Sequence, residues 1–383
     1  MKNINPAVRN SSVLSNSQLK AAWNFYRLGL LEDAESICQE ILQSFPKEAE
    51  ALHLLGAIAL HYGKAKEAAL ISSMAIQCNG KNPETYSNLG LAYHEQGLLI
   101  DAVKQYQHAI ALDPNYVNAY YNLHAALLDP ADVKPALALL RKLLNLNPND
   151  ADARFMAAIL SAYTDEDNEP GRGLNSISQQ SSLYQARIDA WNYLKNSKQP
   201  MPPIMGSGIQ VFRHAMAAAP ADGMVLEFGV RFGTSIRMLA SLAEKVDGFD
   251  SFEGLPDEWH HEPKGSYTTK GVIPEVPANV SLYTGWFEDT LPQFLAQHAG
   301  PVRFINVDCD IYSSTKTVLE LLAPRMVVGS VIVFDEYIGN EHWREDEFKA
   351  FQEAVVKYGW QYEYLCFSFF TKQVAVKITQ ITS

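Results

Sequence analysis

Residues 83–116 read PETYSNLGLAYHEQGLLIDAVKQYQHAIALDPNY, and the same pattern of residue types returns every 34 positions through the first half of the chain. The first three units have a glycine near the middle, and all four have an alanine at the same later position and a proline or glycine near the end. The recurring positions are Gly29, Gly63 and Gly97, then Ala34, Ala68, Ala102 and Ala136, then Pro46, Gly80, Pro114 and Pro148. A constant period of this length predicts stacked helix pairs, which bury a core only when several units pack together.

Small residues in the unit explain how its two helices pack. Gly90 and Ala102 leave room for two backbones to approach closely, and Gly97 suits the turn between the helices. Pro114 starts the next unit because proline cannot continue a helix. We expect four units over 15–48, 49–82, 83–116 and 117–150, followed by a capping helix that ends at 163.

The third unit resembles the tetratricopeptide repeat position by position. The matching residues are Tyr86, Leu89, Gly90, Tyr93, Ala102, Tyr106, Ala109 and Pro114. The resemblance implies an all-α solenoid and a groove that binds a protein or peptide partner; the alternative is a purely structural spacer. The fourth unit departs most from the pattern, with Leu140 and Leu143 at positions for small or aromatic residues.

Composition bounds the kind of protein. A chain of 383 residues is long enough for two or three domains, and 47% hydrophobic residues suffice for ordinary cores. The net charge of −12 opposes non-specific attraction to nucleic acid or to an anionic membrane surface. The sequence allows a homo-oligomer but does not indicate the oligomeric state.

Cysteine spacing and hydropathy bear on the compartment. The four cysteines lie far apart with no CxxC pair, which excludes the usual zinc and redox motifs and favours a reduced, cytoplasmic protein. The N-terminal stretch MKNINPAVRNSSVLSNSQ has no apolar core of a signal peptide, and no stretch approaches a membrane span.

The 34-residue period ends before residue 164, which indicates the start of a second domain. Residues 164–180, TDEDNEPGRGLNSISQQ, have no periodicity, so we predict a tail over 1–14, repeats over 15–163, a linker over 164–180 and a second domain over 181–383. There, short β-branched runs alternate with amphipathic helices, which predicts an α/β fold with a mainly parallel sheet. The expected strands are 224–230, 245–251, 280–285, 302–310, 329–336, 362–368 and 373–379, with helices near 233–244, 287–298, 314–324 and 344–358.

Polar residues follow the predicted strands, where open α/β sheets bind ligands. The first strand ends in EFGVRFGTS (227–235), a glycine-containing turn into a helix whose acidic Glu227 suits a cationic ligand. Asp250 ends the second strand and could accept hydrogen bonds from both hydroxyls of a ribose. Trp286 follows the third strand and offers a flat surface to an adenine, or else packs a helix.

Four carboxylates follow two further strands: Asp308, Asp310, Asp335 and Glu336. Such groups repel one another unless a cation lies between them, and hard oxygen ligands favour magnesium. The alternative is that the aspartates only cap the helices that follow.

The ordered motifs EFGVRFGTS, FDSFEGLP, GWFEDTLP, VDCDIYSST, VIVFDEY and WREDEFKAFQE resemble the macrocin O-methyltransferase family of class I S-adenosylmethionine-dependent methyltransferases. The resemblance covers about 181–383. It implies a Rossmann-like fold with a seven-stranded sheet, S-adenosylmethionine as the methyl donor, a Mg²⁺ ion, and methylation of a sugar hydroxyl.

Carried over by position, the resemblance assigns roles to single residues. The donor site comprises Glu227, Gly229, Gly233, Ser235, Asp250, Ser251, Gly285 and Trp286, and the metal ligands are Asp308, Asp335 and Glu336. Because a hydroxyl acceptor must lose its proton, we expect Asp308, or a neighbouring carboxylate, to act as the catalytic base. Two positions depart from the family: Cys309 replaces a glycine and can narrow the pocket, and Glu336 replaces an aspartate.

The segment 251–279 is long and irregular, which is typical of a lid. His260 and His261 lie on it and could touch the acceptor, although adjacent loop histidines are more often merely exposed. Two other functions stay open at this stage: a protein methyltransferase that recruits its substrate through the repeats, and a non-catalytic scaffold that only binds the nucleoside. A nicotinamide-dependent oxidoreductase is less favoured because the loop lacks GxGxxG.

Overall fold

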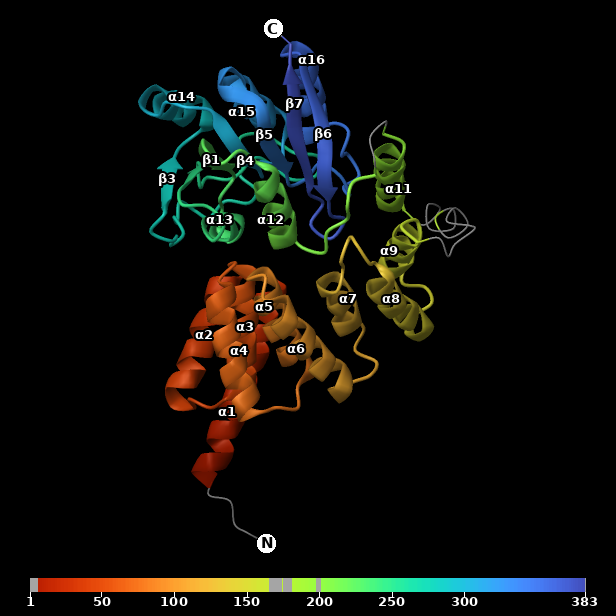
Figure 1. Cartoon of the computed structure of the whole chain (residues 1–383). Helices are drawn as coiled ribbons and strands as arrows, with labels where there is room; N and C mark the ends of the chain where they lie inside the picture. Colours follow the sequence, from red (N-terminus) through yellow and green to blue (C-terminus); the bar gives the residue numbers. More distant parts are fainter. Residues whose placement is uncertain (1–5, 165–173, 175–180, 198–200, 383) are drawn as a thin grey trace. The chain divides into compact units, whose positions relative to one another are not determined.

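The computed structural model describes residues 6–164, 174, 181–197 and 201–382. The chain divides into two compact units, Met1–Leu123 and His124–Ser383, of which the first is helical and the second is built around a β-sheet (Figure 1). The predicted fold class, a helical repeat solenoid followed by an α/β domain, is confirmed.

The first unit consists of antiparallel helix pairs at the predicted period. Its helices are α1 (Pro6–Arg27), α2 (Leu31–Ser44), α3 (Ala49–His61), α4 (Ala65–Cys78), α5 (Pro83–Glu95), α6 (Leu99–Leu112) and the start of α7 (Val117–Ala126). Helix α1 begins inside the predicted tail 1–14, at a proline, which is well tolerated in the first turn of a helix.

The small residues of the repeat act as the sequence suggests. A Cβ atom on Gly90 would lie 2.6 Å from the ring of Tyr106, so only glycine lets α5 approach the fully buried Tyr106 of α6. Gly97 adopts φ +71° at the turn between these helices, a left-handed conformation that glycine reaches without strain.

The second unit contains a seven-stranded sheet in the order β3-β2-β1-β4-β5-β7-β6. Strands β1 to β5 are parallel, and β7 runs antiparallel to both of its neighbours. The strands are β1 (Met224–Phe228), β2 (Val246–Asp250), β3 (Val280–Thr284), β4 (Val302–Val307), β5 (Met326–Phe334), β6 (Trp360–Phe367) and β7 (Val374–Ile381). β4 and β5 end before Asp308 and Asp335, which places these carboxylates just beyond the sheet edge.

Helices cover both faces of this sheet (Figure 1). On one face, α12 and α13 share an apolar core with the strands, in which Phe212, Ile236 and Phe304 are buried. The opposite face carries α14, α15 and α16. The helices of the second unit are α8 (Lys134–Leu146), α9 (Ala151–Ser161), α11 (Ser182–Lys195), α12 (Gly208–Ala218), α13 (Thr234–Ala240), α14 (Phe287–Gln297), α15 (Tyr312–Leu322) and α16 (Glu347–Lys357).

Most of the last predicted repeat, from His124 onward, belongs to the second compact unit. This differs from the predicted division at 163, because aromatic contacts join α7 and α9 to the α/β domain. The Tyr163 hydroxyl also donates a 2.8 Å hydrogen bond to the carbonyl of Pro202. Of the predicted linker 164–180, only Thr164 and Leu174 lie within the described residues.

Within the described part of the chain, we find no helix with the length and apolar character needed to cross a membrane.

Candidate functional site

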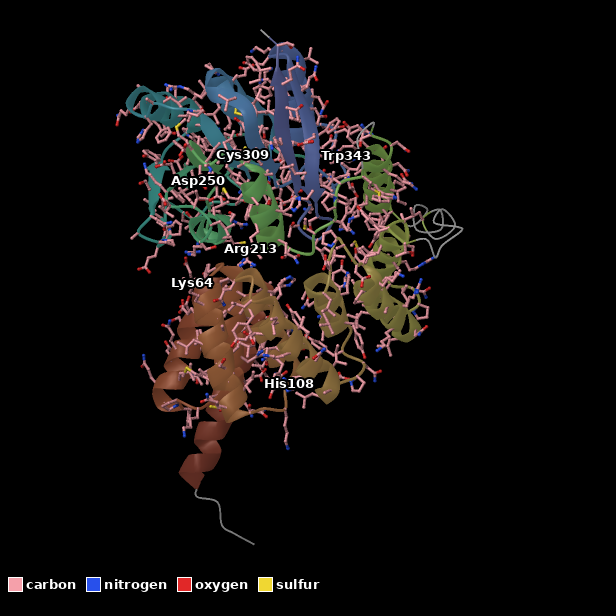
Figure 2. The ribbon with its side chains drawn as sticks, in the orientation of Figure 1. Lys64, His108, Arg213, Asp250, Cys309 and Trp343 are labelled. Carbon is pink, nitrogen blue, oxygen red and sulfur yellow. The ribbon has the colours of Figure 1, made fainter. Side chains whose placement is uncertain are left out.

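The carboxyl ends of four neighbouring parallel strands bring acidic residues to one edge of the sheet. Phe228 pairs with Phe249 and with Val307, and Val307 pairs with Phe334. Asp250, which ends β2, and Asp308 and Asp335, which follow β4 and β5, therefore start from neighbouring strand ends, although they lie far apart in sequence. Asp250 and Cys309 mark this region in Figure 2.

The glycine loop after β1 is fixed by Asp250. The backbone amides of Val230 and Arg231 donate to Oδ2 of Asp250 at 2.8 and 2.7 Å, and the amide of Phe252 donates to Oδ1 at 2.7 Å. Gly233 adopts φ +81° as the N-cap residue of α13. Asp250 thus holds the loop in place. Its hydrogen bonds to a ribose remain a prediction, and a ribose would have to share the two carboxylate oxygens with these backbone amides.

The end of β3 lies beside Asp250. The amide of Gly285 donates to the carbonyl of Asp250 at 3.0 Å, and Trp286 is the half-buried N-cap residue of α14. The hydroxyl of Ser251 accepts a hydrogen bond from the amide of Glu253. The structure therefore brings the predicted ribose and adenine residues together at the ends of β2 and β3.

Glu227 is fully buried on β1. Its Oε1 accepts a 2.8 Å hydrogen bond from Asn306 Nδ2, and its Oε2 has no hydrogen-bond partner among the described residues. Burial raises the pKa of this carboxyl to about 8, and the nearby polar groups of Ser235 and Asn306 offset only part of that rise. A buried oxygen without a partner at a ligand edge suits a cationic group of a ligand.

We expect Glu227→Gln to raise the melting temperature more at pH 8 than at pH 5, by about 5 °C. The folded protein keeps the Glu227 proton until the pH reaches about 8, whereas the unfolded chain releases it near 4.5, so the free energy of unfolding falls as the pH rises between these values. Gln has no proton to release. Calorimetry across this range checks the prediction, with the exposed Glu244→Gln as control; an unchanged pH dependence in Glu227→Gln contradicts it.

Three further carboxyl groups gather beyond β4 and β5. Burial raises the pKa of Asp308 well above its ordinary value, and the nearby charges of Asp335 and Asp310 raise it further. Burial likewise raises the pKa values of Asp310 and Asp335 to about 7, with Glu336 adding to each. All three side chains are only half-buried, so the cluster stays accessible from solvent. The charges of these carboxyl groups influence one another, and their convergence on a single ion stays a prediction.

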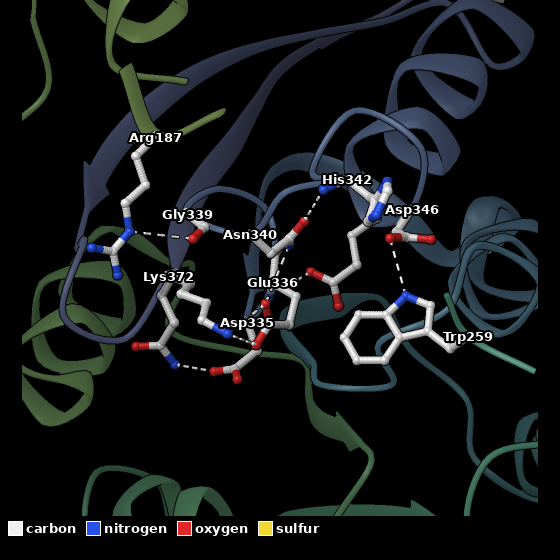
Figure 3. A network of polar contacts seen from close by, with 11 residues as sticks. Arg187, Trp259, Asp335, Glu336, Gly339, Asn340, His342, Asp346 and Lys372 are labelled. Atoms are coloured by element: carbon white, nitrogen blue, oxygen red, sulfur yellow. Dashed lines mark hydrogen bonds and ion pairs between the residues drawn. The ribbon is translucent and has the colours of Figure 1, made fainter. Parts of the chain in front are cut away.

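Glu336 has a different environment from the other three. Its Oε1 and Oε2 accept hydrogen bonds from Lys372 Nζ at 2.7 and 3.1 Å, and Oε2 also accepts one from Asn340 (Figure 3). Asp335 is held differently, because its Oδ1 accepts a 2.7 Å hydrogen bond from Gln373 Nε2. The structure thus pairs one predicted metal ligand, Glu336, with a lysine that the sequence analysis did not consider.

Glu347, the first residue of α16, also lies here, although no sequence motif assigned it to the site. Its side chain is fully buried, its Oε2 accepts the amide hydrogen of Glu336, and its Oε1 has no partner among the described residues. Burial raises its pKa well above the ordinary value, with the charge of Asp335 the next cause. A signal was available: Glu347 shares its helix face with Ala350, Phe351 and Ala354, where an acidic residue is unusual.

Cys309 and Asp310 lie between the strand and α15. The thiol of Cys309 is buried 3.5 Å from the hydroxyl of Thr315 on α15, while Asp310 adopts φ +60°. Aspartate tolerates this left-handed conformation better than most residues. The contact with Thr315 shows that the Cys309 side chain packs against α15.

The irregular segment 251–279 is tied to the loop before α16. Trp259 Nε1 and His260 Nε2 both lie within hydrogen-bonding distance of Asp346 Oδ2, at 3.1 and 2.8 Å. The His260 ring stacks on His342 with 3.8 Å between centroids. His261, in contrast, is exposed. Of the two predicted histidines, only His260 forms part of this junction.

Two family models match this chain, one in each of its two parts. Residues 226–337 match the family described as a methyltransferase domain, and residues 99–129 match the tetratricopeptide repeat. The chain therefore carries a methyltransferase domain joined to tetratricopeptide repeats.

Similarity to individual proteins is partial. A Streptomyces olivaceus protein named 8-demethyl-8-(2,3-dimethoxy-alpha-L-rhamnosyl)-tetracenomycin-C 4'-O-methyltransferase is 34% identical over 30% of this chain and 55% of its own length. The mouse protein O-mannosyl-transferase TMTC1 is 35% identical over 25% of this chain and 11% of its own length. The solved structure of CalS11, calicheamicin methyltransferase, aligns with a TM-score of 0.36 and 20% identity, covering 60% of this chain and 91% of that one. The chain thus spans about half the length of the first of these relatives, and far less of the second.

Proposed function

We propose that this chain transfers a methyl group from S-adenosylmethionine to a hydroxyl group of a sugar-containing acceptor, while its repeats bind a protein partner. The observation that carries the proposal is the accessible cluster of Asp308, Asp310 and Asp335 beside the glycine loop. A neutral hydroxyl needs a base, and these carboxylates supply one where the donor would bind.

The residues at the β1 edge fit the donor. The partnerless, buried Oε2 of Glu227 suits the ammonium group of the methionine moiety, and Ser235 lies close to the same carboxylate. Gly229 and Gly233 adopt the positive φ values that shape the loop, and Gly285 with Trp286 follow β3 beside Asp250. These residues would orient the donor so that its methyl group faces the acidic cluster.

A divalent cation would find hard carboxylate oxygens here, on groups whose pKa values are raised by burial and by one another's charges. Asp308 and Asp335 would hold such an ion. Glu336, the third predicted ligand, is not part of the proposed metal site, because its charge is neutralised by the ion pair with Lys372. A bound Mg²⁺ would lower the pKa of the acceptor hydroxyl.

In the proposed reaction, the hydroxyl oxygen of the acceptor attacks the methyl carbon. The carbon–oxygen bond forms as the carbon–sulfur bond breaks, and S-adenosylhomocysteine leaves with a neutral sulfur. Asp308 accepts the hydroxyl proton. The Trp259 and His260 contacts with Asp346 would keep the lid segment closed over the reacting groups and exclude water.

The sugar acceptor is supported by the name of the relative from Streptomyces olivaceus, which is a 4'-O-methyltransferase of a rhamnosyl compound. We therefore expect labelled S-adenosylmethionine, incubated with this protein and a cell extract, to give a labelled small saccharide or glycoside. Mass spectrometry of the product identifies it. A parallel reaction with a chelator in place of Mg²⁺ should be slower.

Other outcomes point elsewhere. Label in polypeptide, undiminished by the chelator, would replace the sugar acceptor by a protein. Donor binding without any transfer, unchanged in Asp308→Ala, would indicate a nucleoside-binding scaffold.

A further inference from the structure

The six residues that join β6 to β7, 368–373, make contacts in two directions. Because β7 is antiparallel to β5 and to β6, their connection lies at the same edge of the sheet as the carboxyl end of β5. Phe334, the last residue of β5, pairs with Val374, which in turn pairs with Phe367. The β6–β7 turn, as we call residues 368–373, is therefore a neighbour of Asp335 and Glu336.

Toward the acidic cluster, the turn supplies two side chains. Gln373 Nε2 donates to Asp335 Oδ1, and Lys372 Nζ forms an ion pair with both oxygens of Glu336 (Figure 3). The carbonyl of Lys372 also accepts the amide hydrogen of Ile338 at 3.3 Å. Side-chain and backbone bonds thus link the turn to the loop that carries the two carboxylates.

The turn itself is firmly built. The hydroxyl of Thr371 donates to Gln373 Oε1 at 2.8 Å, which leaves the amide nitrogen of Gln373 to face Asp335. The buried Ser368 hydroxyl accepts the amide hydrogens of Phe370 and Thr371. The orientation of Gln373 therefore follows from the shape of the turn.

In the other direction, the turn packs on the last helices of the repeat array. Phe369 is buried with its ring 4.9 Å from that of Phe155 on α9, nearly edge to face. The ring of Phe370 lies 4.9 Å from that of His124 on α7. These residues all belong to the second compact unit.

We propose that the β6–β7 turn is a positioning element that rests on α7 and α9 through Phe370 and Phe369 and holds Asp335 and Glu336 through Gln373 and Lys372. The last repeat is then a required part of the methyl-transfer site, and not only a surface for a partner. The proposal rests on the proposed function for its effect on turnover, but the mechanical connection can be tested without any turnover.

The first test measures hydrogen exchange of the backbone in the full-length protein. Phe155→Leu removes the aromatic contact far from the carboxylates, and we expect the segment 335–341, including the Ile338 amide, to exchange at least about threefold faster. Strand β2 serves as the internal reference. Tyr106→Leu is the matched control, because it removes an equally buried aromatic ring from α6. If Phe155→Leu destabilises the whole chain, the half-buried Phe370→Leu replaces it.

The second test concerns the role of Lys372 and Gln373 in the reaction. We expect Lys372→Met and Gln373→Leu each to lower kcat by about tenfold with little change in donor affinity, and Lys372→Arg to restore most of the rate. Lys372→Arg keeps the ion pair with Glu336, so it separates loss of that pair from misfolding. Misfolding caused by any change at Lys372 would lower the rate in Lys372→Met and in Lys372→Arg alike.

Two results overturn the proposal. Exchange in 335–341 that stays at the wild-type rate in Phe155→Leu and Phe370→Leu would show that the repeat does not hold the turn. An unchanged kcat in Lys372→Met and Gln373→Leu would show that the turn does not position the carboxylates. If the protein methylates none of the acceptors tested, the exchange experiment still decides the connection, so the two proposals fail separately.

Discussion

Replacing Asp308 with Asn is expected to lower the rate of methyl transfer by about a thousandfold or more. The amide has nearly the same shape as the carboxylate but cannot accept the proton of the acceptor hydroxyl, and it weakens the hold on a cation beside Asp335. The donor is expected to bind almost normally, within about tenfold of the wild-type affinity, since the proposed donor contacts come from β1, β2 and β3. Single-turnover rates and calorimetric binding of S-adenosylhomocysteine measure the two effects separately.

A surface variant controls for the loss of a negative charge. Asp222 is exposed in the segment before β1, so Asp222→Asn should leave both rate and affinity unchanged. A large loss of donor affinity in Asp308→Asn would mean that this residue serves binding instead of proton transfer. Retention of most of the rate would remove Asp308 from the mechanism.

Replacing Gly229 with Ala is expected to destabilise the α/β unit by about 3 kcal/mol or more and to abolish donor binding. The residue adopts φ +91°, and a Cβ atom there would lie 1.7 Å from the carbonyl oxygen of Asp308. That oxygen cannot move away easily, because the Asp308 amide donates to the carbonyl of Phe228 at 2.8 Å. The ends of β1 and β4 would have to separate, and the glycine loop would lose its position.

Gly265 separates the steric clash from the cost of the backbone conformation. It adopts φ +85°, yet a Cβ atom on it would meet nothing within 4 Å. Gly265→Ala should therefore cost only the conformational penalty, about 1–2 kcal/mol. Chemical denaturation compares the two variants. Equal losses in both would show that the close approach of β1 to β4 is unimportant.

Much of the architecture could be predicted because it depends on local patterns. The period of 34 predicted the helix pairs, and the alternation of β-branched runs with amphipathic helices predicted the sheet. Expected strand positions were close, although β4 ends at Val307, three residues before the predicted end. The prediction placed that end too late because the apolar Cys309 between the two aspartates prolongs the alternating pattern, although Asp308 and Asp310 are themselves typical of turns.

The site was only partly predictable. Strand order brings Asp308 and Asp335 together as expected, since parallel strands share one edge for their carboxyl ends. Sequence could not show that Lys372 pairs with Glu336, because the two lie 36 positions apart and meet only through the antiparallel pairing of β5 with β7. Nor could it show that the amides of the glycine loop occupy the oxygens of Asp250.

By itself, the sequence determined the helical repeats, the α/β class of the second half and the positions of most acidic residues, because periodicity and turn chemistry act between residues close in the chain. Only the tertiary structure decided which charges are neutralised, that Glu347 joins the acidic cluster, and that the last repeat packs with the α/β domain. These features depend on residues brought together by strand pairing and packing, over separations that run from 11 positions for Glu336 and Glu347 to more than 200 for Phe155 and Phe369. Patterns among residues that are neighbours in sequence cannot predict such contacts.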